Sequence, residues 1–252
     1  MSKFFTLLGR EVKSFFYSPI GYVVLVFFLF SSGFTFSTAV EAIKSAGPTE
    51  ITVIQAFFLI VPFWWVFILV FPLITMRSFS EEFKMGTIET LMTAPIHDWQ
   101  VVLAKFFGVF VFYAILWLPS LLYFAVFQFF SHTNAAQAAG AYWASYLLLV
   151  LMGMFFISIG CFASVLTRNQ IVAAVISFVA ITFLFFAGIL GGEMLNMSSH
   201  MRDLFAYFST YEHMTEFSKG VIDSRPIVFY TTMTILMLVL TLQVFQSRKW
   251  KL

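Results

Sequence analysis

One compact polar segment, RSFSEEFKMGTIETLMTAPIHDW at residues 77–99, separates two long apolar runs. It holds four of the chain's twelve acids, Glu81, Glu82, Glu89 and Asp98, and two of its fourteen bases. Paired carboxylates combined with histidines could form a membrane protease or a metal site. The same segment could instead place a short helix in the groove of a soluble partner.

The composition identifies an integral membrane protein. Of the 252 residues, 61% are hydrophobic, 10% are charged and 36 are Phe, whereas a soluble domain has about a quarter of its residues charged. The net charge of +2 is small and the bases are dispersed, so a nucleic-acid partner is not expected. The single cysteine, Cys161, lies in an apolar run and is expected to be a small buried hydrophobe.

Six apolar runs are long enough to cross about 30 Å of hydrocarbon as helices, which takes about 20 residues each. None contains Asp, Glu, Lys, Arg or His, although ion-coupled carriers usually keep such groups in the membrane. We therefore predict an all-α membrane protein with six transmembrane helices in a single domain, residues 1–252. The runs are Ile20–Phe36, Phe57–Met76, Phe106–Phe130, Tyr142–Leu166, Ile171–Leu190 and Ile227–Val244.

The basic residues between the runs predict the orientation of the chain. With the N-terminus inside, the inside segments hold ten bases and five acids, a net charge of +5. The outside segments then hold four bases and seven acids, a net charge of −3. Basic loops stay in the cytoplasm, so both termini and residues 77–99 are predicted to be cytoplasmic.

This orientation argues against a catalytic or metal site. His97 would lie inside, while His132, His200 and His213 would lie outside, and no two have the four-residue spacing of a helical metal site. The sequence also has no Gly-x-x-x-x-Gly-Lys-Ser/Thr loop for ATP phosphates. We predict that the chain is not an enzyme and binds no cofactor or metal itself.

Residues 1–18 are predicted to form an amphipathic helix on the inner face of the membrane. Phe4, Leu8 and Phe15 recur at helical spacing, and bases lie opposite them. Glu11 falls within the apolar arc and needs a partner. A base of the polar segment is one candidate, and a neighbouring Lys to which Glu11 reaches along the surface is the other.

The polar segment itself predicts two short helices. Ser78 and Glu81 fit a capping box, and Glu81 with Glu82 would lie in the first turn, where the helix dipole favours acids. Gly86 then interrupts the helix and Thr87 can cap a second one, TIETLM. In that second helix Ile88, Leu91 and Met92 would be apolar anchors for a partner and Glu89 a polar one; an amphipathic loop on lipid headgroups is the alternative.

Residues 191–226 form the long outside segment. SSHMRDLFAYF and TYEHMTEFSKG each start with a capping candidate, and Gly220 is a good end for the second helix. Their aromatic residues suit short helices at the outer interface. Elsewhere, Gly160 and Ser164 have the spacing of small residues that allows close helix contacts.

Three motifs together resemble those of type-2 ABC exporter permeases. They are GREVKSFFYSPIGY at the start, R-x-x-x-EE-x-x-x-GTIETLM-x-API after the second span, and TYEHMTEFSKGVIDSRPIVFY outside. The first and third look closest to the permease of the gliding-motility ABC transporter group. The resemblance extends over nearly the whole chain.

The resemblance implies a role for each motif. The coupling helix after the second span, which docks onto a separate ATPase, would include Glu81, Glu82, Gly86, Thr87, Ile88, Glu89, Leu91 and Met92. Arg10 and Glu11 would belong to the connecting helix, and His213, Gly220 and Asp223 to the outer motif, where a structural role is expected.

The resemblance also implies the partners and the location. These are an ABC ATPase subunit that binds ATP and Mg²⁺, a second permease copy or a related permease, and the lipid of the bacterial inner membrane; an accessory extracytoplasmic subunit stays open. A membrane scaffold or passive channel with no ATPase partner is the alternative function.

Overall fold

The computed structural model describes residues 2–46, 51–88, 96–131, 139–193 and 207–249. Within these ranges every regular element is a helix, which confirms the predicted all-α fold. The long helices are α2 (Pro19–Ala46), α4 (Val61–Thr75), α7 (Asp98–Ser131), α8 (Ala139–Leu166), α9 (Gln170–Glu193) and α12 (Ser224–Lys249). The short helices are α1 (Ser2–Tyr17), α3 (Val53–Leu59), α5 (Ser80–Met85) and α11 (Thr210–Ser218).

Six stretches of the described residues are long and apolar enough to cross a membrane, which confirms the predicted number of spans. The chain is therefore a multi-pass membrane protein. The stretches are Pro19–Ser45, Val61–Met85, Asp98–Phe127, Gly140–Leu166, Gln170–Ile189 and Ser224–Arg248.

The second span begins later than predicted. The apolar run from Phe57 is divided, because α3 ends at Leu59 and the backbone of Ile60 is extended, with φ −74° and ψ 140°. The helix that spans the membrane, α4, starts at Val61. Pro62 lies in its first turn, where a missing N–H breaks no helical hydrogen bond. Hydropathy alone could not reveal this break because both sides of it are apolar.

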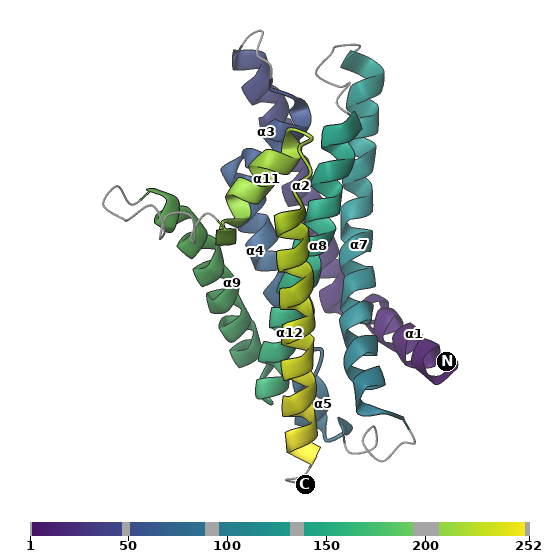
Figure 1. Ribbon diagram of the computed structural model, residues 1–252. Helices are drawn as coiled ribbons and strands as arrows, with labels where there is room; N and C mark the ends of the chain where they lie inside the picture. Colours follow the sequence, from purple (N-terminus) through teal and green to yellow (C-terminus); the bar gives the residue numbers. More distant parts are fainter. Residues whose placement is uncertain (1, 47–50, 89–95, 132–138, 194–206, 250–252) are drawn as a thin grey trace.

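Helix α8 is the centre of the bundle and packs against α4, α7, α9 and α12 (Figure 1). In its most apolar stretch 78% of the residues are buried, against 28% or less in α2, α9 and α12. The outer helices therefore expose most of their apolar surface, as expected for helices that face lipid.

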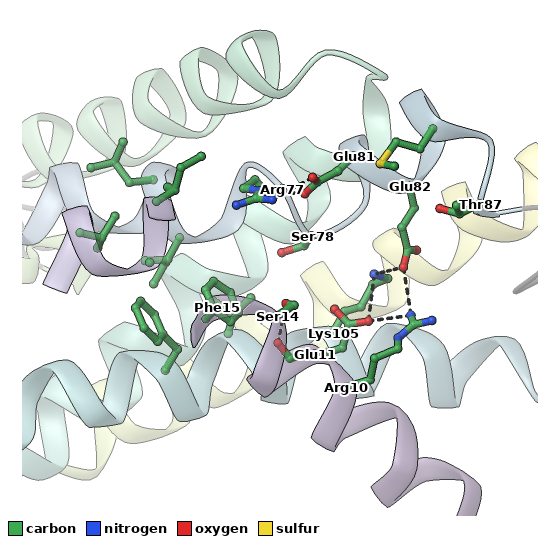
Figure 2. Close-up of a pocket in the computed structure, with 18 residues that line it drawn as sticks. Arg10, Glu11, Ser14, Phe15, Arg77, Ser78, Glu81, Glu82, Thr87 and Lys105 are labelled. Carbon is green, nitrogen blue, oxygen red and sulfur yellow. Dashed lines mark hydrogen bonds and ion pairs between the residues drawn. The ribbon is translucent and has the colours of Figure 1, made fainter. Parts of the chain in front are cut away.

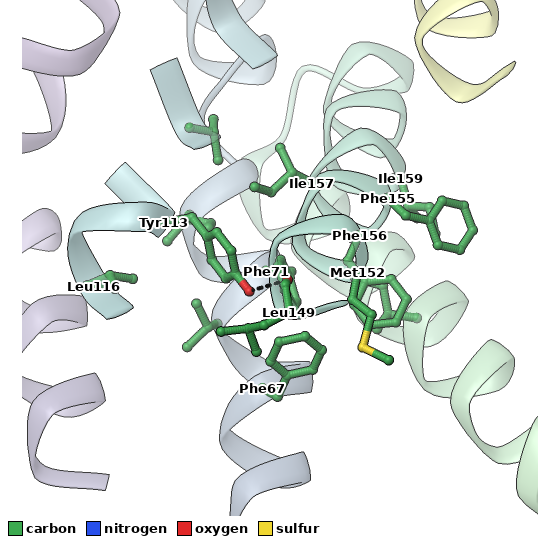
Figure 3. Packing of buried hydrophobic residues seen from close by; sticks show 14 of the residues in the cluster. Phe67, Phe71, Tyr113, Leu116, Leu149, Met152, Phe155, Phe156, Ile157 and Ile159 are labelled. Atoms are coloured by element: carbon green, nitrogen blue, oxygen red, sulfur yellow. Dashed lines mark hydrogen bonds between the residues drawn. The ribbon is translucent and has the colours of Figure 1, made fainter. Parts of the chain in front are cut away.

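Aromatic packing between α4, α7 and α8 fills the middle of the bundle (Figure 3). The ring of Tyr113 packs directly on Gly153, because a Cβ at position 153 would lie 2.3 Å from Cε1 of the tyrosine. The hydroxyl of Tyr113 donates a hydrogen bond to the carbonyl of Leu149 at 3.0 Å. A Cβ at Gly160 would lie 2.1 Å from Oγ1 of Thr75, which confirms the predicted close contact of that helix. The central helices are therefore held in close contact by glycines.

The polar elements lie at the two ends of the bundle. Helix α5 and the end of α12 lie at one end, and α1 crosses the same half of the molecule, while α3 and α11 lie towards the other end (Figure 1). This arrangement agrees with the predicted grouping of both chain ends with the polar segment.

Candidate functional site

Helix α5 is capped by a residue from a distant helix. The predicted capping box of Ser78 and Glu81 is wrong, because α5 begins at Ser80 and its N-cap residue, Phe79, gives no side-chain hydrogen bond. Instead, the hydroxyl of Ser164 in α8 accepts hydrogen bonds from the backbone N–H groups of Phe79 and Ser80, at 3.0 and 3.1 Å. The same hydroxyl satisfies two N–H groups that lack helical partners, so α5 is fixed to the central helix.

The other local predictions for α5 are confirmed. Glu81 and Glu82 lie in its first turn. Gly86 ends the helix with φ +72°, in the left-handed region that favours glycine. Thr87 follows in a turn. The chain thus leaves α5 in a direction set by the backbone conformation of a single glycine.

Four charged residues from three helices meet beside α5 (Figure 2). The Nζ of Lys105 in α7 lies 2.9 Å from Oε1 of Glu82 in α5 and 3.4 Å from Oε1 of Glu11 in α1. The Nη2 of Arg10 lies 3.0 Å from Oε1 of Glu82 and 2.9 Å from Oε1 of Glu11. We call Arg10, Glu11, Glu82 and Lys105 the four-charge cluster. Its formal charges cancel, and it ties α1, α5 and α7 together.

Neither of the two partners predicted for Glu11 is the one that the structure shows. The base comes from α7 and from the adjacent Arg10, and the polar segment supplies an acid, Glu82, where a base was one candidate. The other candidate, a neighbouring Lys reached along the surface, is not observed either, because the lysine that pairs with Glu11 is Lys105, far along the chain in α7. Lys105 is only 2% exposed, so this pairing is inside the protein and not along the surface.

The four-charge cluster keeps the carboxylate of Glu11 charged although it is buried. Burial would raise the pKa of Glu11, but the Lys105 ammonium and the Arg10 guanidinium outweigh it and leave that pKa lowered. Burial would likewise lower the pKa of Arg10, while Glu11 and Glu82 raise it. Both side chains are therefore ionised at neutral pH, and the cluster is held together by charge.

A glycine allows the cluster to form. The backbone of α1 passes so close to α7 that a Cβ at Gly108 would lie 2.7 Å from the Cβ of Glu11. Gly108 follows Lys105 by less than one turn of helix. The carboxylate of Glu11 therefore reaches the lysine only because position 108 has no side chain.

A second ion pair holds the corner between the first span and α5. The guanidinium of Arg77 donates from Nε to Glu81 at 2.7 Å and from Nη2 to the same carboxylate at 2.8 Å. Its third nitrogen donates to the hydroxyl of Ser18, which lies between α1 and α2. Both acids of the Glu-Glu pair are thus partners of arginines, Glu82 of Arg10 in α1 and Glu81 of Arg77 in the turn between α4 and α5.

The two ion-pair systems border one cavity of about 290 Å³ between α1, α2, α4, α5 and α7 (Figure 2). Glu11, Glu81, Glu82, Thr87 and Lys105 line it. Its walls therefore combine the predicted connecting helix with the start of the predicted coupling segment.

The remaining predicted residues of this segment are only partly described. Ile88 is 3% exposed and packs in the core of the chain, so it is not an exposed anchor. Glu89, Leu91 and Met92 fall outside the described residues, as does most of the predicted helix TIETLM. The next helix, α7, starts at Asp98, which therefore lies in its first turn.

The outer motif has a structural core. The ring nitrogen Nδ1 of His213 lies 3.1 Å from the hydroxyl of Tyr230, and burial lowers the pKa of His213 to about 4 although Asp223 opposes the shift. Gly220, at φ +86°, ends α11 as predicted, with its N–H on the carbonyl of Phe217. Asp223 accepts a hydrogen bond from the backbone N–H of the nearby Arg225 at 3.0 Å.

His213 and Asp223 therefore interact electrostatically, but each forms its hydrogen bond with a different partner. In the described part of the chain no three His, Cys, Asp or Glu residues are grouped so that they could hold a metal ion. Of the two predicted outer helices, the second is α11, and the first falls largely outside the described residues.

Sequence reasoning missed three residues that organise these sites. Lys105, Ser164 and Tyr230 each lie in a span, far along the chain from the groups that they bind. A signal was available for Lys105, because it is the one base within the long apolar stretch after Asp98. Ser164 was expected only as a small residue at a helix contact, and nothing in the sequence indicates that it caps α5 or that Tyr230 binds His213.

Comparison with protein families gives one match. A family model described as ABC-2 family transporter protein matches residues 6–250. A search of curated proteins found no match. The matched region extends from α1 to the end of α12, so it includes the four-charge cluster, the cavity and the outer motif.

Proposed function

This chain belongs to the family of ABC-2 transporter proteins, and from that premise we propose that it is the permease subunit of an ATP-driven exporter. The family implies an ABC ATPase as a partner. The finer proposal is that residues 86–97 touch this ATPase, and that α5 and α1 pass its movement to the spans.

The observation that supports this proposal most directly is the four-charge cluster. It joins the first turn of α5, near the start of the polar segment, to α1 and α7 through ion pairs of 2.9 to 3.4 Å. Ser164 also fixes α5 to α8. A displacement of α5 would therefore act on three helices at once, namely α1, α7 and α8. A loop that only lay on lipid would need no such connection.

Energy would come from the partner. The chain has no phosphate-binding loop of the Walker type, so ATP and Mg²⁺ would bind to the ATPase. Two ATPase subunits closing on ATP would move the coupling segments of two permeases. The second permease would be another copy of this chain or a related one, and the pathway would open from the inside to the outside.

The location and the subgroup are part of the same proposal. Both termini and the polar loop would face the cytoplasm of a bacterium, with the chain in the inner membrane. Its motifs are most similar to those of the gliding-motility group of permeases, which implies neither motility nor a particular cargo.

The test is affinity purification of the full chain from its native membranes in mild detergent, followed by mass spectrometry. We expect an ATPase with a Walker motif to copurify in stoichiometric amount. Glu89→Lys should remove it, while Glu216→Lys, an exposed acid on α11 at the other end, should leave it bound.

Two outcomes would count against the proposal. If no ATPase copurifies, a scaffold or passive channel is the better account. If Glu89→Lys and Glu216→Lys have the same effect, the polar loop is not the contact.

A further inference from the structure

A second, more open groove of about 830 Å³ lies on the other side of the same arginines. It runs along α1 to the corner where α2 begins, and Arg77 borders it from the end of the second span. Its charged lining residues are Arg10, Lys13 and Arg77, with no carboxylate among the described residues that line it. We propose that this groove binds the phosphate headgroup of an anionic phospholipid.

The cations keep donors available for a phosphate. Arg10 uses a single nitrogen, Nη2, for both Glu11 and Glu82, so the donors on its other two nitrogens are not needed for the four-charge cluster. Lys13 is exposed and makes no ion pair with another described residue. Guanidinium and ammonium groups placed together are a suitable site for phosphate oxygens.

The acids that neutralise these arginines face another space. Glu11, Glu81 and Glu82 line the cavity of about 290 Å³ and do not line the groove. The arginines therefore lie in a wall with acids on one side and an open cationic surface on the other. A phosphate in the groove would meet positive charge without a carboxylate that repels it.

The position of the groove favours a lipid over a free phosphate. Ser18 and Pro19 in its lining mark the point where the first span begins, which is the depth of the headgroups if α1 lies on the membrane as the sequence predicts. Tyr17 and Phe5, also in the lining, are 82% and 63% exposed. Exposed aromatic residues beside bases are typical of protein surfaces at the membrane interface.

The proposal is tested on the full chain in nanodiscs made from an equimolar mixture of phosphatidylglycerol and phosphatidylcholine. Native mass spectrometry then measures which phospholipid stays bound after release from the disc. We expect phosphatidylglycerol to be enriched, and Lys13→Gln to reduce that enrichment by about fivefold. Lys84→Gln is the matched control, since Lys84 is exposed on α5 at the same end and does not line the groove.

Each other outcome decides against a lipid site here. Equal retention of both phospholipids would overturn it, as would an equal loss with Lys84→Gln, which would indicate diffuse surface charge. Release of phosphatidylglycerol by inorganic phosphate at constant ionic strength would identify free phosphate as the ligand. Because Lys13 makes no described ion pair, an unchanged melting temperature of Lys13→Gln confirms that the variant is folded.

Discussion

The Nζ of Lys105 lies 2.9 Å from Oε1 of Glu82, and this ion pair joins the third span to the start of the polar loop. Lys105 is 2% exposed, whereas Arg10, which binds the same carboxylate at 3.0 Å, has a side chain 54% exposed. The carboxylate of Glu82 is therefore bound by one buried cation, Lys105, and by one exposed cation, Arg10. Removing the buried cation should therefore cost far more stability than removing the exposed one, because it leaves buried carboxylates without a buried counter-charge, whereas solvent screens the exposed pair.

Removing Lys105 should be much more damaging than removing Arg10. Lys105→Met leaves Glu11 and Glu82 with only an exposed partner, and we expect a loss on the order of 3 kcal/mol in the free energy of unfolding. Arg10→Met should cost less than about 1 kcal/mol. Both values can be measured by thermal or denaturant unfolding of the purified protein in detergent.

A double variant checks that the loss comes from unpaired charge. Glu82→Gln together with Lys105→Met removes both members of the pair, so it should cost less than the sum of the two single changes. Additive losses would mean that the two side chains act independently, contrary to the geometry.

The close approach of α1 to α7 gives a second prediction. Gly108→Ala puts a methyl group 2.7 Å from the Cβ of Glu11, so α1 must move and the Glu11 carboxylate must leave Lys105. We expect a clear drop in melting temperature and a faster proteolytic cleavage of α1. Gly9→Ala is the control, because its Cβ meets nothing within 4 Å and alanine favours a helix by up to about 1 kcal/mol. If both variants melt alike, the contact at Gly108 is not limiting.

The spans could be predicted from the sequence because burial in lipid demands long apolar helices, whatever the tertiary packing. Gly86 and Gly220 were equally predictable, since each ends a helix with the positive φ that glycine favours. The break at Ile60 was not, because an apolar run does not reveal where a helix stops and restarts.

The site could be predicted only in part, for a physical reason. The sequence placed Glu11 on an apolar face and so implied that it has a partner, but ion pairs between residues of different helices depend on how those helices pack. The cap from Ser164 and the bond from Tyr230 to His213 have the same origin. Local patterns therefore predicted which groups need partners and not which residues provide them.

The outer motif predicts a dependence of stability on pH. In the unfolded chain His213 has the ordinary pKa of 6.5, while burial lowers it to about 4 in the folded protein. The unfolded state thus binds the proton more readily between these values. The contribution of neutral His213 to the free energy of unfolding should be fully present above pH 6.5. It should be lost as the pH falls towards 4, by on the order of 3 kcal/mol.

The variant His213→Gln isolates this contribution from that of the carboxylates. Glutamine keeps a hydrogen bond within reach of Tyr230 but does not titrate, so the fall between pH 6.5 and 4 should be smaller than in the natural chain. Melting temperatures in detergent across this range provide the measurement. Identical pH profiles would show that His213 does not titrate as its burial requires.

Gly86 sets the direction of the chain as it leaves α5 towards the proposed ATPase contact. Its φ of +72° disfavours other residues, yet a Cβ there would meet nothing within 4 Å. Gly86→Ala should therefore act through the backbone alone, at about 1 kcal/mol, and should lower the ATPase activity of the reconstituted complex. Gly86→Asn should retain more activity, because asparagine tolerates the left-handed conformation.

Gly140→Ala is the matched control, since its Cβ also meets nothing within 4 Å and its φ is not positive. It should leave the activity unchanged. The order of the three variants separates two explanations of any loss at Gly86. If Asn is more active than Ala, the backbone conformation matters, whereas a greater loss with the larger Asn would indicate that side-chain bulk obstructs the partner at this surface.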